Sequence, residues 1–176
     1  MGKGKLFVGL TAILIAGYVV ASPFITVYQM KSAAEKNDIE ALSEHIEFPS
    51  LRQSIKDQVN SMLVEKLAND KNLKGNAFAE LAMVFAGSVV DRAVDVYVTP
   101  NGISKIMTGE KVSLGEMGQS SEGQVKKEPF KNASFSYEST DKFVVTVANK
   151  SDEPVRFILR RQGFSWKLTD IRLPLN

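Results

Sequence analysis

The chain has 176 residues, with 22 Lys and Arg, 20 Asp and Glu and no cysteine. Lys3 and Lys5 are the only charged side chains among the first 30 residues, so the rest of the chain carries no net formal charge. A neutral domain lacks the basic surface on which nucleic-acid binding depends. The absence of cysteine excludes disulfides, thiolate metal sites and a lipidated cysteine.

An uncharged run of 25 residues separates Lys5 from Lys31. A membrane-spanning helix needs about 20 apolar residues, because a charged side chain is costly in hydrocarbon. Residues 1–21 therefore predict a cytoplasmic tip and a membrane anchor, with the two lysines kept inside by the positive-inside rule. The predicted anchor residues are Leu6, Phe7, Val8, Leu10, Ile13, Leu14, Ile15, Val19 and Val20.

A cleaved signal peptide is the alternative interpretation of residues 1–21. Its charged region would be Met1–Lys5, and cleavage would fall between Ala21 and Ser22. We favour the anchor, because the apolar character continues to Met30, further than a signal peptide needs. Ser22 and Pro23 interrupt the run. Ser is a good N-cap and Pro fits the first helical position, which predicts that a new or kinked helix begins there.

Residues 22–176 predict a single exported domain with helices first and a sheet last. Apolar residues three and four apart indicate about four helices after the anchor, including one over 51–67 capped by Ser50 and a core helix over 77–98. Residues 109–132 are rich in Gly, Ser and Gln and predict a flexible loop. The last 44 residues alternate apolar and polar side chains in four segments, which predicts an antiparallel meander. The fold class is therefore α+β, with helices on one face of the sheet.

Several short motifs together resemble a bacterial family known as domain of unknown function 2939. They are Ala21-Ser22-Pro23-Phe24, Tyr28-Gln29-Met30-Lys31, Asp38-Ile39-Glu40-Ala41-Leu42, Phe48-Pro49-Ser50-Leu51-Arg52, Thr99-Pro100-Asn101-Gly102 and the ending Trp166–Pro174. The resemblance implies an N-terminal membrane segment and an exported domain in a Gram-negative bacterium. It implies no catalytic residues, since the family has no assigned activity.

A looser similarity is to the cone-shaped fold of cystatin-like and nuclear-transport-factor-2-like proteins. In that fold helices wrap a curved sheet, and a strand of the Trp166-Lys167-Leu168 kind closes it. The fold occurs in enzymes, ligand binders and interaction domains, so it implies no particular function.

His45 is the only histidine, and it lies between Glu44 and Glu47. An active site would need a carboxylate to converge on it, and one histidine without a cluster is more often a surface or half-buried residue. Asp91 and Asp95 are one helical turn apart, where a salt-bridged face is more common than a cation site. No phosphate-binding or nucleophile motif is present, so we expect no enzyme activity and no cofactor.

Four residues form the candidate binding site. Arg156 and Arg160 share one face of a predicted strand and could bind an anion or a lipid headgroup, although a solvated sheet face is more common. Trp166 and Phe143 could line an apolar cavity, although alternating strand residues more often pack against helices. The expected partners are membrane lipid and an envelope protein or small apolar ligand.

The sequence thus predicts a single-pass protein of the bacterial inner membrane, with a cytoplasmic N-terminus and a periplasmic, non-enzymatic domain that binds a ligand or a protein. Two alternatives stay open. One is an enzyme of the cone-shaped fold with a pocket around His45 and a carboxylate. The other is a cleaved, soluble periplasmic protein.

Overall fold

The computed structural model describes residues 3–69, 87, 89–107, 128–148 and 154–173. The helices are α1 (Lys3–Glu35), α2 (Ile39–Ser43), α3 (Phe48–Asn69) and α5 (Pro100–Met107), with a further helical stretch at 89–97. The strands are β1 (Ser134–Ser139), β2 (Lys142–Val147), β3 (Val155–Gln162) and β4 (Ser165–Arg172). The α+β class is confirmed. Most of the loop predicted at 109–132, and residues 77–86 of the predicted core helix, lie outside the described residues.

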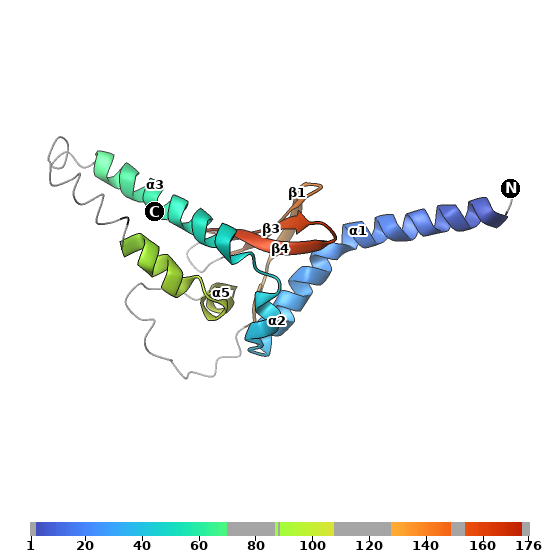
Figure 1. Cartoon of the computed structure of the whole chain (residues 1–176), viewed down its shortest axis with the longest axis horizontal. Coiled ribbons are helices and arrows are strands. Elements are labelled where there is room, and N and C mark those ends of the chain that lie inside the picture. The colour runs from blue at the N-terminus through green and yellow to red at the C-terminus, as the bar shows by residue number, and fades with distance from the viewer. Residues whose placement is uncertain (1–2, 70–86, 88, 108–127, 149–153, 174–176) are drawn as a thin grey trace.

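Helix α1 is one continuous helix of 33 residues with Pro23 inside it. Of the two forms predicted at Ser22 and Pro23, a new helix capped by Ser22 is therefore wrong, whereas a kink in a continuing helix agrees with the turn of α1 in Figure 1. Proline removes one N–H from the helix ladder and crowds the carbonyl four residues earlier, which bends a helix more often than it ends it when neighbouring groups compensate. Figure 1 shows the outer part of α1 projecting away from the other elements and the inner part turning toward α2.

A Schellman motif ends α1. Asn37 adopts a left-handed φ of 56°, which a short polar side chain tolerates. The Asp38 N–H donates to the Ala33 carbonyl (2.8 Å) and the Asn37 N–H donates to the Ala34 carbonyl (3.2 Å), the paired bonds of a Schellman end. Asp38 then caps α2, because its carboxylate accepts from the Ala41 N–H at 3.0 Å. The chain reverses here and brings α2 back against α1.

Helix α3 begins three residues earlier than expected. It starts at Phe48, with Pro49 in the first turn, where the missing N–H costs nothing. Ser50 is therefore inside the helix rather than its cap. Leu51 and Ile55 are buried, whereas Val64 is exposed toward the far end of the helix. The apolar stripe is thus most deeply buried at the end of α3 that packs on β4.

The sheet is an antiparallel meander in the order β1-β2-β3-β4. The outer edge of β4 is partly paired by the segment between α2 and α3: the Leu168 N–H donates to the His45 carbonyl (2.8 Å), and the Glu47 N–H donates to the Leu168 carbonyl (2.9 Å). This pairing occupies backbone groups that an open strand edge would expose. Strand β1 forms the opposite edge, and all six of its residues are exposed.

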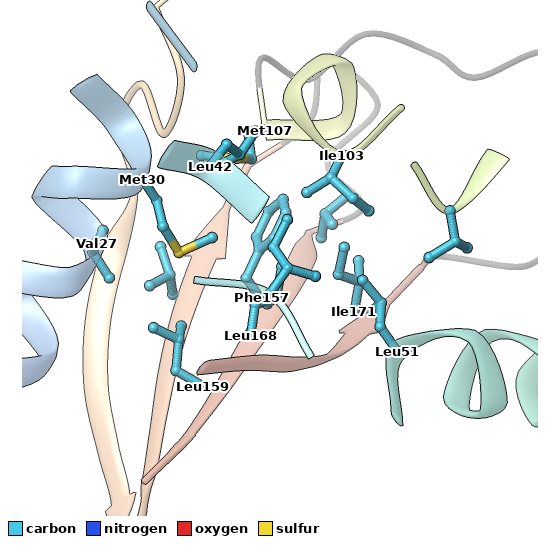
Figure 2. Packing of buried hydrophobic residues seen from close by; sticks show 14 of the residues in the cluster. Val27, Met30, Leu42, Leu51, Ile103, Met107, Phe157, Leu159, Leu168 and Ile171 are labelled. Atoms are coloured by element: carbon cyan, nitrogen blue, oxygen red, sulfur yellow. The ribbon is translucent and has the colours of Figure 1, made fainter. Parts of the chain in front are cut away.

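The helices cover one face of the sheet and bury a single apolar cluster. Figure 2 shows Val27 and Met30 from α1, Leu42 from α2 and Leu51 from α3 meeting Phe157, Leu159, Leu168 and Ile171 from the sheet, with Ile103 and Met107 above them. The predicted packing of helices on one face is confirmed. The cone-like shape stays a prediction.

Candidate functional site: the junction of α1 with the sheet

The outer part of α1 is apolar and exposed. Apart from Val19, which is partly buried, the large apolar side chains from Phe7 to Val20 are between half and three-quarters exposed. The helix is long and apolar enough to cross a membrane, by length and composition, and a signal sequence near an N-terminus has the same properties. Ser22, which is 7% exposed, is the first buried residue in the described part of α1. The junction between the apolar segment and the folded core is therefore at Ser22 and Pro23.

A short hydrogen-bond relay holds this junction. The Trp166 indole Nε1–H donates to the Ser22 hydroxyl oxygen at 2.8 Å. The Ser22 hydroxyl in turn donates to the Val19 carbonyl at 2.8 Å. Since Pro23 has no N–H, it cannot donate to the Val19 carbonyl as an ordinary residue at that position would. Ser22 therefore satisfies the carbonyl that the proline leaves unpaired, and Trp166 fixes Ser22 to β4.

Tyr137 makes a second polar contact with the bent part of α1. Its hydroxyl donates to the Val20 carbonyl at 2.7 Å. Burial raises the pKa of Tyr137, and the nearby Arg161 partly opposes this rise. The phenol therefore keeps its proton at physiological pH and stays available as a donor. Two strands, β1 and β4, thus each bind one turn of α1 beside Pro23.

An aromatic cluster fills the space around these contacts. Phe24 of α1 packs edge-on against Phe143, with ring centroids 4.8 Å apart, and also contacts Phe135 at 5.9 Å. Tyr137 contacts both Phe143 (4.9 Å) and Trp166 (6.1 Å). Edge-to-face pairs of this kind add to the apolar burial. The side chains of Phe143 and Trp166, which the sequence suggested as the lining of a ligand cavity, are at most 1% exposed and are enclosed by this cluster and α1.

The two arginines of the candidate site lie on the other face of the sheet. Arg156 pairs with Glu138, which also binds Lys142 at 2.6 Å. Arg160 pairs with Asp141 at 3.0 Å. The Lys142 hydrogen bond lowers the pKa of Glu138, and the Ser139 hydroxyl lowers that of Asp141. The structure thus separates Arg156 and Arg160 from Trp166 and Phe143, and gives both arginines carboxylate partners.

A groove of about 580 Å³ opens between the first turns of α3 and the end of β4. The Asp170 carboxylate at its base accepts hydrogen bonds from the Ser54 hydroxyl and from Arg172 Nε, the latter at 2.8 Å. The Gln58 amide donates to the adjacent Ile171 carbonyl at 2.9 Å. These polar groups satisfy one another, so the arrangement fastens α3 to β4. The sequence does not predict this arrangement, because Ser54 and Asp170 are 116 residues apart.

Asp91 and Asp95 face α3 rather than a shared cation. Asp91 lies 3.0 Å from the Lys56 ammonium, and Asp95 lies 3.6 Å from Arg52 Nε. The salt-bridged face that the spacing predicted is confirmed. Among the residues that the structure describes, no three His, Asp or Glu side chains gather in a way that could hold a metal ion.

His45 is half-buried beside Lys167, between α2 and α3. Burial lowers its pKa, the Lys167 charge lowers it further, and Glu44 opposes both. The unfolded chain therefore takes up this proton at a higher pH than the folded chain. Stability from His45 is fully present above about pH 6.5 and falls as the pH drops through the lowered value.

We expect the unfolding midpoint to fall modestly between pH 7.5 and pH 5.5, and His45→Gln to remove part of that fall. Thermal unfolding of the full chain in a mild detergent measures it. Glu138 and Asp141, whose pKa values are lowered, titrate below this range and do not contribute. An identical pH dependence in His45→Gln and the parent chain would contradict the assignment.

The family comparison bears on the helical half of the chain. A family profile described as "Protein of unknown function (DUF2939)" matches residues 12–106, more than half of the sequence. The chain belongs to the DUF2939 family. The match begins inside the apolar part of α1 and ends in α5, so the bent junction at Ser22 and Pro23 is part of what the DUF2939 profile describes. No curated protein and no solved structure matches the chain.

The DUF2939 match confirms the family suggested by the sequence motifs, with one restriction. Five of the six motif regions, from Ala21 to Gly102, lie within the matched residues, whereas the ending Trp166–Pro174 lies beyond them. Trp166 nevertheless binds Ser22, which lies in the matched part. The junction therefore joins the matched helices to the sheet that follows them.

Proposed function

We propose that this protein is a single-pass inner-membrane protein whose periplasmic α+β domain is a non-enzymatic protein-interaction module held at the membrane surface. The observation that carries the proposal is the continuity of α1, which runs from the apolar segment into the core without a linker. The relay from Trp166 through Ser22 to Val19 makes that connection stiff. A domain attached in this way keeps a fixed orientation to the bilayer.

The same contacts favour a retained anchor over a cleaved signal peptide. A cut between Ala21 and Ser22 would fall inside α1. It would remove the Val20 carbonyl that Tyr137 binds and the Val19 carbonyl that Ser22 binds. Tyr137 and Ser22 would each lose a hydrogen-bond acceptor that the fold provides for them, and the loss is costly for Ser22, whose side chain is buried. Cleavage would thus weaken the domain that it releases.

Packing favours a protein contact over a small apolar ligand. Phe24 of α1 packs against the aromatic side chains that could have lined a ligand cavity and fills the space beside them. A ligand there would have to displace a helix that is part of the core. The surface of the domain is then the part left for binding, and its closeness to the bilayer limits the partners to envelope proteins.

The test combines the intact mass of the membrane-extracted protein with protease accessibility in spheroplasts. We expect a mass that includes residues 1–21 and a domain that externally added protease degrades. The matched control is the same protein in unbroken cells, where the outer membrane should protect the domain. A mature N-terminus at Ser22 would contradict the anchor, and a protected domain in spheroplasts would contradict the periplasmic location.

A further inference from the structure

The apolar segment outside the domain is short for a membrane span. Leu6–Ala21 comprises 16 residues, which at about 1.5 Å per residue reach about 24 Å. The hydrocarbon core of a bilayer is about 30 Å thick. Any tilt of the helix would increase the difference. Since the domain begins at Ser22, the bilayer must extend to the near end of the domain.

The turn between β3 and β4 lies at that near end. Trp166 binds Ser22 at the junction, and Leu168, two residues later in β4, reaches the cluster that contains Met30 of α1. Figure 2 shows Met30 and Leu168 in the same cluster, so both α1 and β4 lead from the junction into the core. The residues before Trp166 therefore lie on the outward side of Ser22, toward the apolar segment. Figure 1 places this end of β4 beside α1.

Phe164 is the most conspicuous side chain of this turn. It is 89% exposed, more than any other large apolar residue in the described part of the chain. Gly163, with φ of 62°, makes the sharp turn that holds Phe164 away from the core. A single exposed apolar residue is ordinary on a soluble surface. Phe164, however, lies beside the apolar part of α1, at the end where that segment is too short to cross the hydrocarbon core. The bilayer at this position would bury its side chain.

Arg161 provides a cation at the same level. It pairs across the strands with Trp166 and lies close enough to Tyr137 to affect it electrostatically. Within the described part of the chain no carboxylate lies at ion-pair distance from Arg161, whereas Arg160 next to it is paired with Asp141. A guanidinium group forms bidentate hydrogen bonds with phosphate. Arginine near a membrane surface is attracted to anionic lipid headgroups.

We propose that the β3–β4 turn is a second membrane contact, in which Phe164 enters the boundary between headgroups and acyl chains beside α1 and Arg161 binds a lipid phosphate. This inference rests on the proposed retention of the anchor. The turn adds apolar surface at the membrane boundary, where the part of α1 outside the domain is too short to cross the hydrocarbon core. With two contacts, α1 and the turn, the domain cannot rotate freely about the membrane normal.

The absence of cysteine allows a clean test by site-directed spin labelling. Phe164→Cys, Val64→Cys and Ile13→Cys are labelled singly in the full chain, reconstituted in vesicles of phosphatidylethanolamine and phosphatidylglycerol. Val64 is the matched control, because it is also an exposed apolar residue and lies on α3, away from the outer part of α1. The accessibility of each label to oxygen, relative to a water-soluble nickel complex, reports its depth in the bilayer.

We expect the label at 164 to be several-fold more accessible to oxygen than to nickel, the label at 64 to be aqueous, and the label at 13 to be deepest. A label at 164 as aqueous as that at 64, with the label at 13 in the bilayer, overturns this inference and leaves the anchor standing. An aqueous label at 13 overturns the anchor itself.

Arg161→Gln in the Phe164→Cys background tests the phosphate contact. We expect the label at 164 to become more accessible to nickel, and the same change when phosphatidylglycerol is left out of the vesicles. Inorganic phosphate added to the labelled Phe164→Cys chain should not change the accessibility of the label, because the proposed ligand is a lipid headgroup. An unchanged label in Arg161→Gln, or displacement by inorganic phosphate, would overturn the lipid contact of Arg161. Circular dichroism in detergent checks that Arg161→Gln is folded.

Discussion

Trp166→Ala is expected to lower the free energy of unfolding by about 3–5 kcal/mol, the range for removing a large aromatic side chain from a core. Trp166 is 1% exposed and contacts Phe143 and Tyr137. The substitution leaves a cavity between α1 and the sheet, and it leaves the Ser22 hydroxyl without its donor. Urea unfolding of the full chain in detergent, followed by circular dichroism, measures the loss. Fluorescence cannot follow it, because Trp166 is the only tryptophan.

The matched control is Phe164→Ala, in the same hairpin. Its side chain is 89% exposed, so in detergent the change in stability should stay within about 0.5 kcal/mol. A loss of similar size in both variants would mean that the hairpin, rather than the indole, is sensitive to substitution.

A double-mutant cycle isolates the hydrogen bond within that loss. Trp166→Phe keeps most of the ring packing, and Ser22→Ala removes the hydroxyl. We expect a coupling energy of about 1 kcal/mol between the two positions, the usual net value of a hydrogen bond. Ser22→Ala alone should also cost stability, since it leaves the Val19 carbonyl without a donor. Zero coupling would show that the indole contributes by packing alone.

Side-chain periodicity predicted the elements whose structure depends on local sequence. The alternation of residues 134–168 predicted all four strands and their antiparallel order. The end of α1 at Asn37 and the cap of α2 at Asp38 are likewise local features, because both need only the residues around them. The pair Asp91 and Asp95 predicted a salt-bridged face from its spacing, and their partners on α3 confirm it.

The junction could not be predicted, because its partners are far apart in the sequence. Ser22 followed by Pro23 has the local pattern of a helix start, and only Trp166, 144 residues later, explains why the helix continues. Likewise the Val20 carbonyl and Tyr137 are 117 residues apart. The strand pattern placed Phe143 and Trp166 on the apolar face. It carried no information on which helix covers them, so packing against helices was favoured only because it is the more common arrangement.

The sequence predicted the charged face of the sheet only in part. Residue parity placed Arg156 and Arg160 on one face, opposite Phe157 and Leu159, and the structure agrees. Their partners Glu138 and Asp141 come from β1 and the turn after it. The register of the meander brings them into reach, and the register depends on turn lengths that the sequence leaves open.

Gly102→Ala is expected to lower the free energy of unfolding by about 3 kcal/mol, at the upper end of the range for overpacking. A Cβ at Gly102 would lie 2.1 Å from the Tyr97 carbonyl oxygen, which is backbone and cannot turn away as a side chain could. The chain folds tightly here: Thr99 caps α5, and its hydroxyl oxygen accepts from the Gly102 N–H at 3.2 Å. Relieving the clash would move α5 and with it Ile103, which is fully buried.

Urea unfolding followed by Trp166 fluorescence measures the effect, since this substitution leaves the tryptophan in place. The matched control is Gly87→Ala, another helical glycine, where nothing lies within 4 Å of the added Cβ. Alanine favours helix there, so that variant should gain up to about 1 kcal/mol. If Gly102→Ala unfolds like the parent chain, the close approach of α5 to Tyr97 is not present in solution. A loss confined to Gly102→Ala would instead tie the Thr99-Pro100-Asn101-Gly102 motif to the packing of α5 over the sheet.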